Sequence, residues 1–146
     1  MDLGHWTFDK DFDPDEWFGF IYRIIDTETN QEYIGKKQFH QHLRKTVKNR
    51  KNKKRVTKPS DWKTYCSSST HVKKALEEKG KDKFQFLIES LHKSKGSLTY
   101  AEVQKQINEN VLTARLPDGS PKYLNKQVAG VKFIPPEIMP DETRMK

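Results

Sequence analysis

The chain has 146 residues, of which one third are hydrophobic and one third charged, and its net charge is +8. This length suits one domain with short tails, and the single cysteine, Cys66, excludes an internal disulfide and a zinc site built from several cysteines of this chain. No apolar run is long enough to span a bilayer and the first residues do not resemble a secretory signal, so we expect a soluble, cytoplasmic protein without a membrane partner.

The beginning of the chain predicts an arm followed by a β-hairpin. Residues 1–16 are acidic and aromatic, and we expect this arm to pack its aromatic side chains on the domain. From 17 to 25 the chain is almost continuously apolar, which fits a strand buried on both faces. The segment 26–31 has turn residues, and 32–37 fits the returning strand.

A turn centred in the segment 26–31 sets the register of this hairpin. Tyr33 then lies opposite Ile24 and Gly35 lies opposite Tyr22, so the two tyrosines are diagonal neighbours on one face. Because Gly35 has no side chain, the space beside Tyr22 stays open. Two phenols that converge over such a space can hold or deprotonate a water molecule.

Downstream of the hairpin the sequence predicts three helices and one further strand. In chain order these are a short helix over 38–45, a helix over 71–79, a strand over 83–91, and a longer helix from Ser97 or Thr99 to about Leu112. Ser69 or Thr70 caps the second helix and Gly80 ends it. We therefore expect a small α+β domain over 17–132, with a three-stranded antiparallel sheet flanked by helices, and an irregular tail over 133–146.

A basic run without any Asp or Glu extends from 36 to 58, and its later part, about 45–58, is expected to be a loop inserted in the domain. Such a run can neutralise phosphates and release their counterions, and a solvated loop is the alternative interpretation. The residues that we expect to bind DNA are Lys37, Lys45, Lys48, Arg50, Lys51, Lys53, Lys54 and Arg55.

The hairpin motifs Phe20-Ile21-Tyr22 and Tyr33-Ile34-Gly35 resemble those of the GIY-YIG nuclease superfamily, in which a similar separation of the tyrosines is typical. The match departs at its first position, where Phe20 replaces the family's glycine, although Gly19 is its neighbour. Tyrosines that only pack a strand pair are the alternative. The family also has an arginine on the helix after the hairpin, a metal-binding glutamate on a later helix and often an asparagine beyond it. The corresponding residues here are Arg44, Glu102 and Asn125.

The resemblance implies a role for each of these residues. Tyr22 and Tyr33 would position and deprotonate the attacking water, and Lys36 would lower the pKa of a phenol or contact phosphate. Arg44 would bind the scissile phosphate through two oxygens. Glu102 would coordinate one Mg²⁺ or Mn²⁺ ion, with the capping pattern Thr99-x-x-Glu102 as the structural alternative.

Two histidines and Asn125 are further candidates. Some family members have a histidine one turn after the arginine, where this chain has Lys48, and His40 or His42 would substitute for it. Asn125 would hydrogen-bond a catalytic tyrosine or a phosphate, or else serve as a turn residue. His71 shows no partner pattern in the sequence.

The resemblance therefore predicts a metal-dependent endonuclease of the homing-type or phage-encoded kind that nicks or cuts double-stranded DNA, as a monomer or homodimer. A phage-encoded enzyme would act in the host cytoplasm. The main alternative is a non-catalytic module in which the basic loop and aromatic side chains hold nucleic acid. A third possibility is an interaction protein that docks through its acidic arm.

Overall fold

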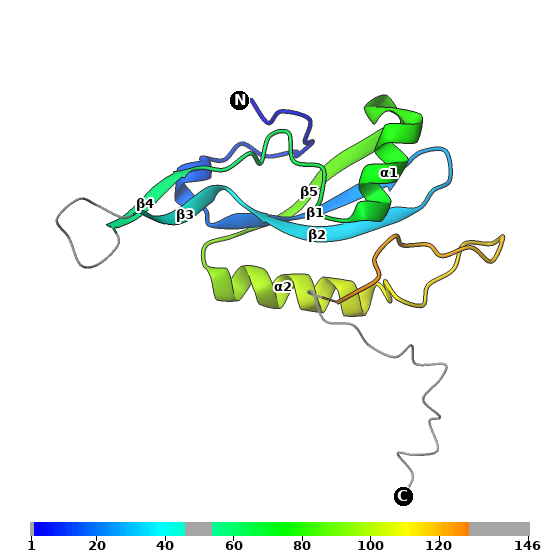
Figure 1. The fold of residues 1–146 in the computed structure, drawn as a ribbon. Coiled ribbons are helices and arrows are strands. Elements are labelled where there is room, and N and C mark those ends of the chain that lie inside the picture. Colours follow the sequence, from blue (N-terminus) through cyan, green and yellow to red (C-terminus); the bar gives the residue numbers. More distant parts are fainter. Residues whose placement is uncertain (1, 46–53, 129–146) are drawn as a thin grey trace, which may run out of the picture.

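A three-stranded antiparallel sheet forms the centre of the computed structural model, which describes residues 2–45 and 54–128 (Figure 1). Its strands are β1 (Gly19–Asp26), β2 (Glu32–Gln38) and β5 (Phe84–His92), in the order β2-β1-β5. Tyr22 pairs with Gly35 and Ile24 with Tyr33, so the predicted register of the hairpin is confirmed. The fold is α+β, as the sequence predicted.

The two helices lie on opposite faces of this sheet (Figure 1). Helix α1 (Thr70–Lys79) contributes Val72 to the cluster that covers Phe20 and Tyr22. Helix α2 (Lys95–Asn108) contributes Leu98 to the cluster on the other face. Among the described residues, neither helix is long and apolar enough to cross a membrane.

The caps of α1 follow the sequence prediction, whereas the ends predicted for α2 are wrong. The Ser69 side chain accepts a hydrogen bond from the Val72 N–H, and Gly80 ends α1 with a φ of 89°. For α2 the cap is Ser94, which accepts from the Ser97 N–H, and the helix ends at Asn108. Glu102 therefore lies in the middle of α2, and the capping-box interpretation of this residue is wrong.

The N-terminal arm is part of the main core. Trp6 is buried and packs its ring against those of Phe20, Tyr22 and Phe86. The arm also extends the sheet, because the Thr7 N–H donates to the Phe86 carbonyl at 2.8 Å, next to the β5 edge. A short 3-10 turn, η1 (Pro14–Glu16), then leads into β1, and a second, η2 (Lys81–Lys83), joins α1 to β5.

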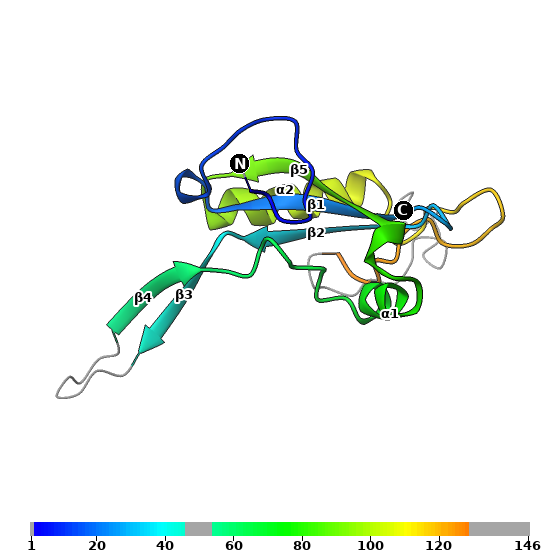
Figure 2. The ribbon, with the colours of Figure 1, turned by 90° about the horizontal axis from the view of Figure 1, so that it is seen from above.

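The short helix predicted over 38–45 is wrong, and so is the loop predicted for the end of the basic run. Strand β3 (His40–Lys45) pairs antiparallel with β4 (Lys54–Pro59) in a separate two-stranded sheet. This ribbon extends away from the three-stranded sheet (Figure 2). The two strands are stabilised by pairing with each other, from Lys45–Lys54 to His40–Pro59, and the local pattern of 38–45 does not reveal this pairing. Lys48, Arg50, Lys51 and Lys53 lie outside the described residues.

Candidate active site

A cavity of about 580 Å³ lies at the outer edge of β2, between the start of α1 and the side of α2. Among the residues that line it are five that the sequence singled out, namely Tyr22, Tyr33, Lys36, Glu102 and Asn125. They come from β1, β2, α2 and the segment after α2. The fold therefore brings together residues that are up to about one hundred positions apart in the sequence.

The two tyrosines of the hairpin are stacked but differ in exposure. Their ring centroids are 6.2 Å apart and their planes differ by 25°. Tyr22 is only 1% exposed, whereas Tyr33 is partly exposed. Gly35 makes this arrangement possible, because a Cβ at position 35 would lie 2.5 Å from the Tyr22 hydroxyl. Tyr33 is thus the more accessible of the two phenols, and the buried Tyr22 packs against it.

Ser67 lies beside both phenols, and no pattern in the sequence predicted this placement. Its side chain interacts with both Tyr22 and Tyr33 and lowers the pKa of each phenol. The Ser69 N–H donates to the Ser67 Oγ at 3.0 Å, which leaves the Ser67 proton free to be donated to a phenol oxygen. Ser67 is 2% exposed and has a φ of 98°, a conformation that non-glycine residues rarely adopt.

The surroundings of both phenols favour their neutral form. Burial raises the pKa of Tyr22 well above its usual value of 10, with a further contribution from Tyr33, while the Ser67 hydrogen bond opposes the shift. Burial also raises the pKa of Tyr33; Ser67 again opposes it, and the negative charge of Glu102 adds to it. A cation that offsets this charge would therefore favour the phenolate form of Tyr33.

Glu102 is the one carboxylate among the described residues that line the cavity. It is 8% exposed, and the Lys36 Nζ lies 3.8 Å from its Oε1. Burial raises the pKa of the Glu102 carboxyl, and the charge of Lys36 opposes that shift. Lys36 also donates a hydrogen bond to the Thr99 Oγ1 at 3.1 Å, which holds its ammonium group beside α2.

The side chain of Asn125 is bound to the backbone of β2. Its Nδ2 donates to the Ile34 carbonyl at 2.8 Å and its Oδ1 accepts from the Ile34 N–H at 3.0 Å. Gln106 donates to the same carbonyl at 2.9 Å. Asn125 therefore acts as an additional strand partner that fixes the edge between Tyr33 and Gly35, and its hydrogen bonds go to this backbone and not to a tyrosine hydroxyl.

Two of the residues predicted to be catalytic do not line this cavity. His40 lies at the base of the ribbon, where its Nε2 is 2.9 Å from the Asp15 Oδ1, and it lines a separate cavity of about 320 Å³. The backbone of Arg44 lies further along β3, opposite Arg55, and not on a helix as predicted. The helix that follows in the chain, α1, contains no arginine. This placement of Arg44 gives no support to its expected role at the scissile phosphate.

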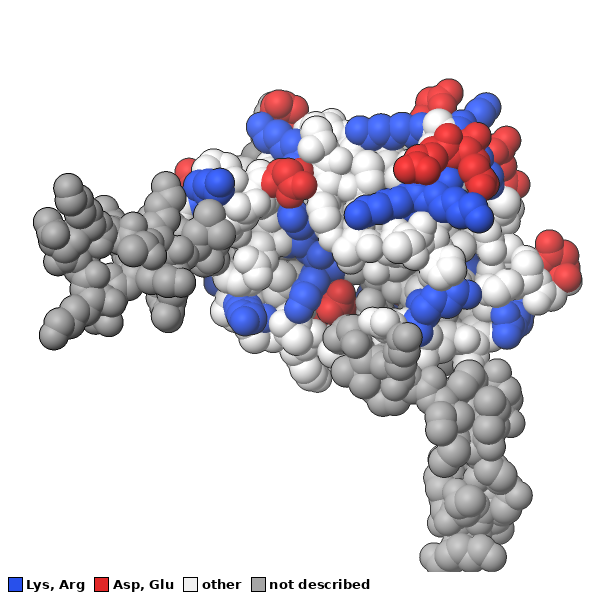
Figure 3. All heavy atoms as spheres, viewed as in Figure 1, with Lys and Arg blue, Asp and Glu red and all other residues white. Residues whose placement is uncertain are grey.

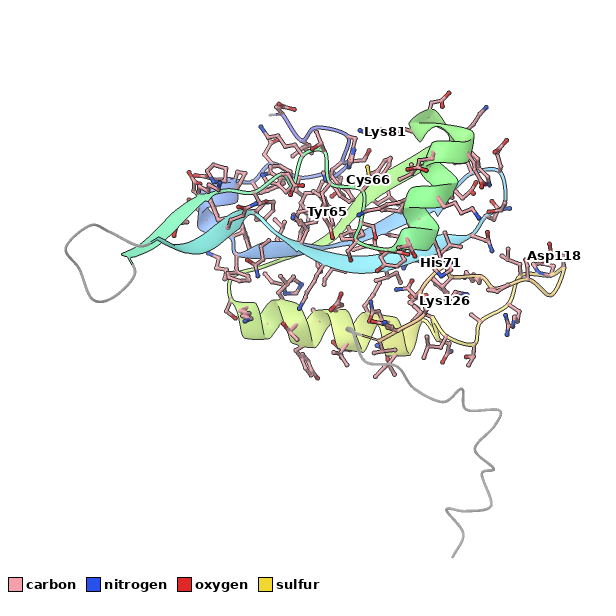
Figure 4. The ribbon with its side chains drawn as sticks, in the orientation of Figure 1. Tyr65, Cys66, His71, Lys81, Asp118 and Lys126 are labelled. Carbon is pink, nitrogen blue, oxygen red and sulfur yellow. The ribbon has the colours of Figure 1, made fainter. Side chains whose placement is uncertain are left out.

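Two further residues that line the cavity, a histidine and a lysine, were not predicted as site residues from the sequence. His71, in the first turn of α1, and Lys126, on the segment after α2, both line it and are exposed (Figure 4). Together with Lys36 they place positive or titratable groups around the opening. Lys37, by contrast, is bound within the fold, because its Nζ lies 2.8 Å from the Asp61 Oδ1 and 4.1 Å from the centroid of the Tyr65 ring.

Comparison with known families agrees with this geometry. The family model described as "Putative endonuclease segE, GIY-YIG domain" matches residues 6–128. That range contains the arm from Trp6, the hairpin, the ribbon, both helices and Asn125. Comparisons with curated proteins and with solved structures give no match. Because the match covers most of the chain, the protein belongs to the GIY-YIG nuclease superfamily and carries an endonuclease domain.

Proposed function

We propose that this chain is a divalent-metal-dependent endonuclease that hydrolyses phosphodiester bonds of double-stranded DNA in the cavity at the β2 edge. The observation that carries the proposal is that Tyr33, Lys36 and Glu102 line one open cavity, with Tyr22 and Ser67 directly behind the exposed phenol. Phosphodiester hydrolysis needs an activated water, relief of negative charge and stabilisation of the departing oxygen. The residues of this cavity can meet each need.

Tyr33 is the residue best placed to hold the attacking water. Its hydroxyl is the more accessible of the two phenols, and Ser67 and Tyr22 fix its direction from the buried side. The phenol oxygen would accept a hydrogen bond from the water, and in its ionised form it would take the proton. Tyr22, which is 1% exposed, positions this network and does not meet the phosphate directly.

The donor set of the cavity suits one hard cation. Glu102 supplies a carboxylate, and in the part of the chain that the structure describes no three His, Cys, Asp or Glu side chains are grouped so that they could hold a metal ion by themselves. Mg²⁺ tolerates such a site, since it commonly keeps several waters and takes its remaining oxygens from a phosphate. A bound Mg²⁺ or Mn²⁺ would supply positive charge that offsets the phosphate and the Glu102 carboxylate.

The cations around the opening would bind the substrate phosphates. Lys36 lies deepest, beside Glu102, and is in reach of a phosphate that approaches the same carboxylate. Lys126 and His71 are exposed at the opening and would contact the phosphates on either side of the bond that is cut. Lys36 and Lys126 would provide at the cavity the charge that the sequence had assigned to Arg44, and His71 would add a hydrogen-bonding group.

A plasmid assay tests this function. Supercoiled DNA is incubated with the protein and Mg²⁺, and cutting should stop when a chelator removes the metal. Tyr33→Phe and Glu102→Gln should each reduce the rate by roughly 100-fold or more. The same gel separates nicked circles from linear DNA, and so distinguishes nicking from double-strand cleavage.

Matched controls come from outside the cavity. Tyr100→Phe on α2 and Glu78→Gln on α1 change the same functional groups at exposed positions and should leave the rate unchanged. Undiminished cutting by both cavity variants would reject the proposed site. Salt-sensitive DNA binding that never produces a new strand end, with any divalent ion, would favour a non-catalytic module instead.

A further inference from the structure

The positive charge of this protein is concentrated in the segment that contains the β3–β4 ribbon. Residues 36–58 contain eleven Lys and Arg and no Asp or Glu, which exceeds the whole net charge of +8, so the rest of the chain is slightly acidic. Outside this segment, basic side chains are often paired with acidic ones, as in Lys63–Asp2 at 3.4 Å and Lys105–Glu89 at 3.6 Å. Acidic and basic groups are accordingly mixed on the face shown in Figure 3.

The register of the ribbon places like charges opposite each other. Arg44 pairs with Arg55, and at the next position Lys45 pairs with Lys54. Like charges directly opposite on paired strands destabilise a sheet. Two such pairs in succession oppose the stability of the ribbon, and a polyanion bound to it would relieve their repulsion. The arrangement therefore points to a ligand with many negative charges.

The shape of the ribbon restricts which polyanion fits. Within the described residues, β3 and β4 form a sheet of their own, and the ribbon extends from the body (Figure 2). Successive register positions belong to opposite faces of a strand pair, so the Arg44/Arg55 and Lys45/Lys54 positions fall on opposite faces. A projection that is basic on both faces suits a groove with phosphates along both walls. A two-stranded ribbon enters the major groove of B-DNA, about 12 Å wide, but not the minor groove, about 6 Å wide.

The base of the ribbon is fixed to the strand that carries the cavity residues. Phe39, between β2 and β3, is 1% exposed and packs its ring 4.9 Å from Trp62 and 5.0 Å from Phe20. The Ser60 N–H donates to the Phe39 carbonyl at 2.9 Å, and the Ser60 Oγ donates to the Gln38 carbonyl at 2.7 Å. The ribbon thus has a defined direction relative to β2.

The distance between ribbon and cavity is compatible with one DNA duplex. Arg44 is nine residues beyond Gly35, which corresponds to roughly 30 Å of extended chain at most. One turn of B-DNA is roughly 34 Å long. We propose that the β3–β4 ribbon inserts into the major groove of double-stranded DNA, within one helical turn of the bond that the cavity cuts. The position of the cut rests on the proposed function, whereas the groove contact itself does not.

A binding assay tests whether the charge of the ribbon contributes to DNA affinity. The full chain is bound to a duplex several turns long, with a chelator present so that no cutting occurs. Lys45→Gln/Lys54→Gln should weaken binding by roughly tenfold and lower the salt dependence of log K by about 2. The control Lys73→Gln/Lys74→Gln, at exposed positions on α1, removes the same charge and should have little effect. The ribbon variant should unfold at the same or a higher temperature than the wild type, because a like-charge pair has been removed.

Modified DNA tests the choice of groove. Bulky groups on C5 of the pyrimidines project into the major groove and should weaken binding of the wild type more than that of the ribbon variant. A ligand that fills the minor groove should not displace the protein. Equal weakening by the α1 control, insensitivity to the C5 groups, or displacement by the minor-groove ligand would each overturn the proposal.

The two proposals fail in different ways. A protein that binds DNA through the ribbon in these assays but cuts no plasmid with Mg²⁺ would refute the proposed function and leave the ribbon contact standing. A protein that cuts DNA, and whose ribbon variant binds as tightly as the wild type, would refute the ribbon contact alone. Glu102→Gln provides the link, since it should bind the duplex normally while failing to cut it.

Discussion

The hydroxyl of Tyr22 occupies the space in which a side chain at position 35 would lie. A Cβ at Gly35 would be 2.5 Å from the Tyr22 Oη and 2.7 Å from its Cζ, closer than non-bonded atoms approach. Gly35 is not among the residues with a positive φ, so the requirement for glycine here is one of space and not of backbone conformation. The glycine of the hairpin motif is therefore a direct part of the tyrosine arrangement.

Gly35→Ala should displace Tyr22 and so disturb both stability and cleavage. Tyr22 is only 1% exposed and is packed among the core aromatic rings, so overpacking should lower the free energy of unfolding by about 1–3 kcal/mol. The cleavage rate should fall as well, because the two phenols no longer stack. Urea unfolding and the plasmid assay measure the two effects.

Gly96→Ala is the matched control for this substitution. Gly96 lies in the first turn of α2, and a Cβ there would meet no atom within 4 Å. The variant should be as active as the wild type and equally or slightly more stable, because alanine favours a helix more than glycine does. If Gly35→Ala behaved in the same way, the close approach of Tyr22 to Gly35 would have no functional importance.

Ser67→Ala should change the pH dependence of cleavage. The Ser67 hydrogen bond lowers the pKa of both phenols, so its loss should raise these pKa values and shift the part of the rate that needs a phenolate to higher pH. Loss of a hydrogen bond to a buried phenol should also cost about 1 kcal/mol of stability. Rates measured across the alkaline range, with urea unfolding in parallel, test both effects.

Ser67→Gly distinguishes the effect of losing the hydroxyl from the effect of backbone strain at this position. With a φ of 98°, this position is strained for serine and favourable for glycine. The glycine variant should therefore regain stability relative to Ser67→Ala, yet keep its shifted pH profile. A pH profile like that of the wild type in either variant would show that the Ser67 hydroxyl does not act on the phenols.

The features that the sequence predicted correctly depend on local patterns. The turn residues before Glu32 set the register that pairs Tyr22 with Gly35, and the cap at Ser69 with Gly80 defines α1. The family resemblance then indicated Glu102, which lines the same cavity as the tyrosines. Each of these predictions uses residues within one element, or a motif with fixed spacing.

The features that the sequence missed depend on long-range contacts. Residues 40–45 have no strong strand pattern of their own and become a strand through pairing with 54–59. Ser67 belongs to a run of three serines, and only the folded chain shows which of them reaches the phenols. Asn125 has the expected position, but its bonds to the Ile34 backbone result from docking of the segment after α2 on the β2 edge.

His5 should make the protein sensitive to mild acid. Its ring stacks on Phe86 with centroids 4.0 Å apart, its Nε2 lies 2.9 Å from the Tyr65 carbonyl, and burial lowers its pKa to about 4. In the unfolded chain a histidine has a pKa of about 6.5. Between these values only the unfolded state binds the proton, so stability should fall as the pH is lowered from about 6.5 to about 4 and then level off.

His5→Gln removes this titration and keeps a side chain that can donate to the Tyr65 carbonyl. The free energy of unfolding of the variant, measured in urea at a series of pH values, should decrease less between pH 6.5 and 4 than that of the wild type. Carboxyl groups with a lowered pKa, such as Asp26 and Glu109, lose their stabilising effect at lower pH in both proteins. Equal slopes in the two proteins would show that His5 does not titrate on unfolding.

Lys36→Gln should have opposite effects on acid tolerance and metal affinity. Burial raises the pKa of Glu102 and Lys36 opposes this shift, so removing the Lys36 charge should raise the pKa further. A carboxylate that holds a cation must be ionised, so the rate should be lost as the pH falls through this pKa, and at a higher pH in the variant.

At neutral pH and above, half-maximal cleavage by Lys36→Gln should need less Mg²⁺, because no ammonium competes with the metal 3.8 Å from the carboxylate. Lys105→Gln is the matched control, because the Lys105 Nζ lies 3.6 Å from Glu89, outside the cavity. This variant should change neither the pH at which the rate is lost nor the Mg²⁺ concentration for half-maximal cleavage. An acid limb unchanged by Lys36→Gln would show that Glu102 does not control it.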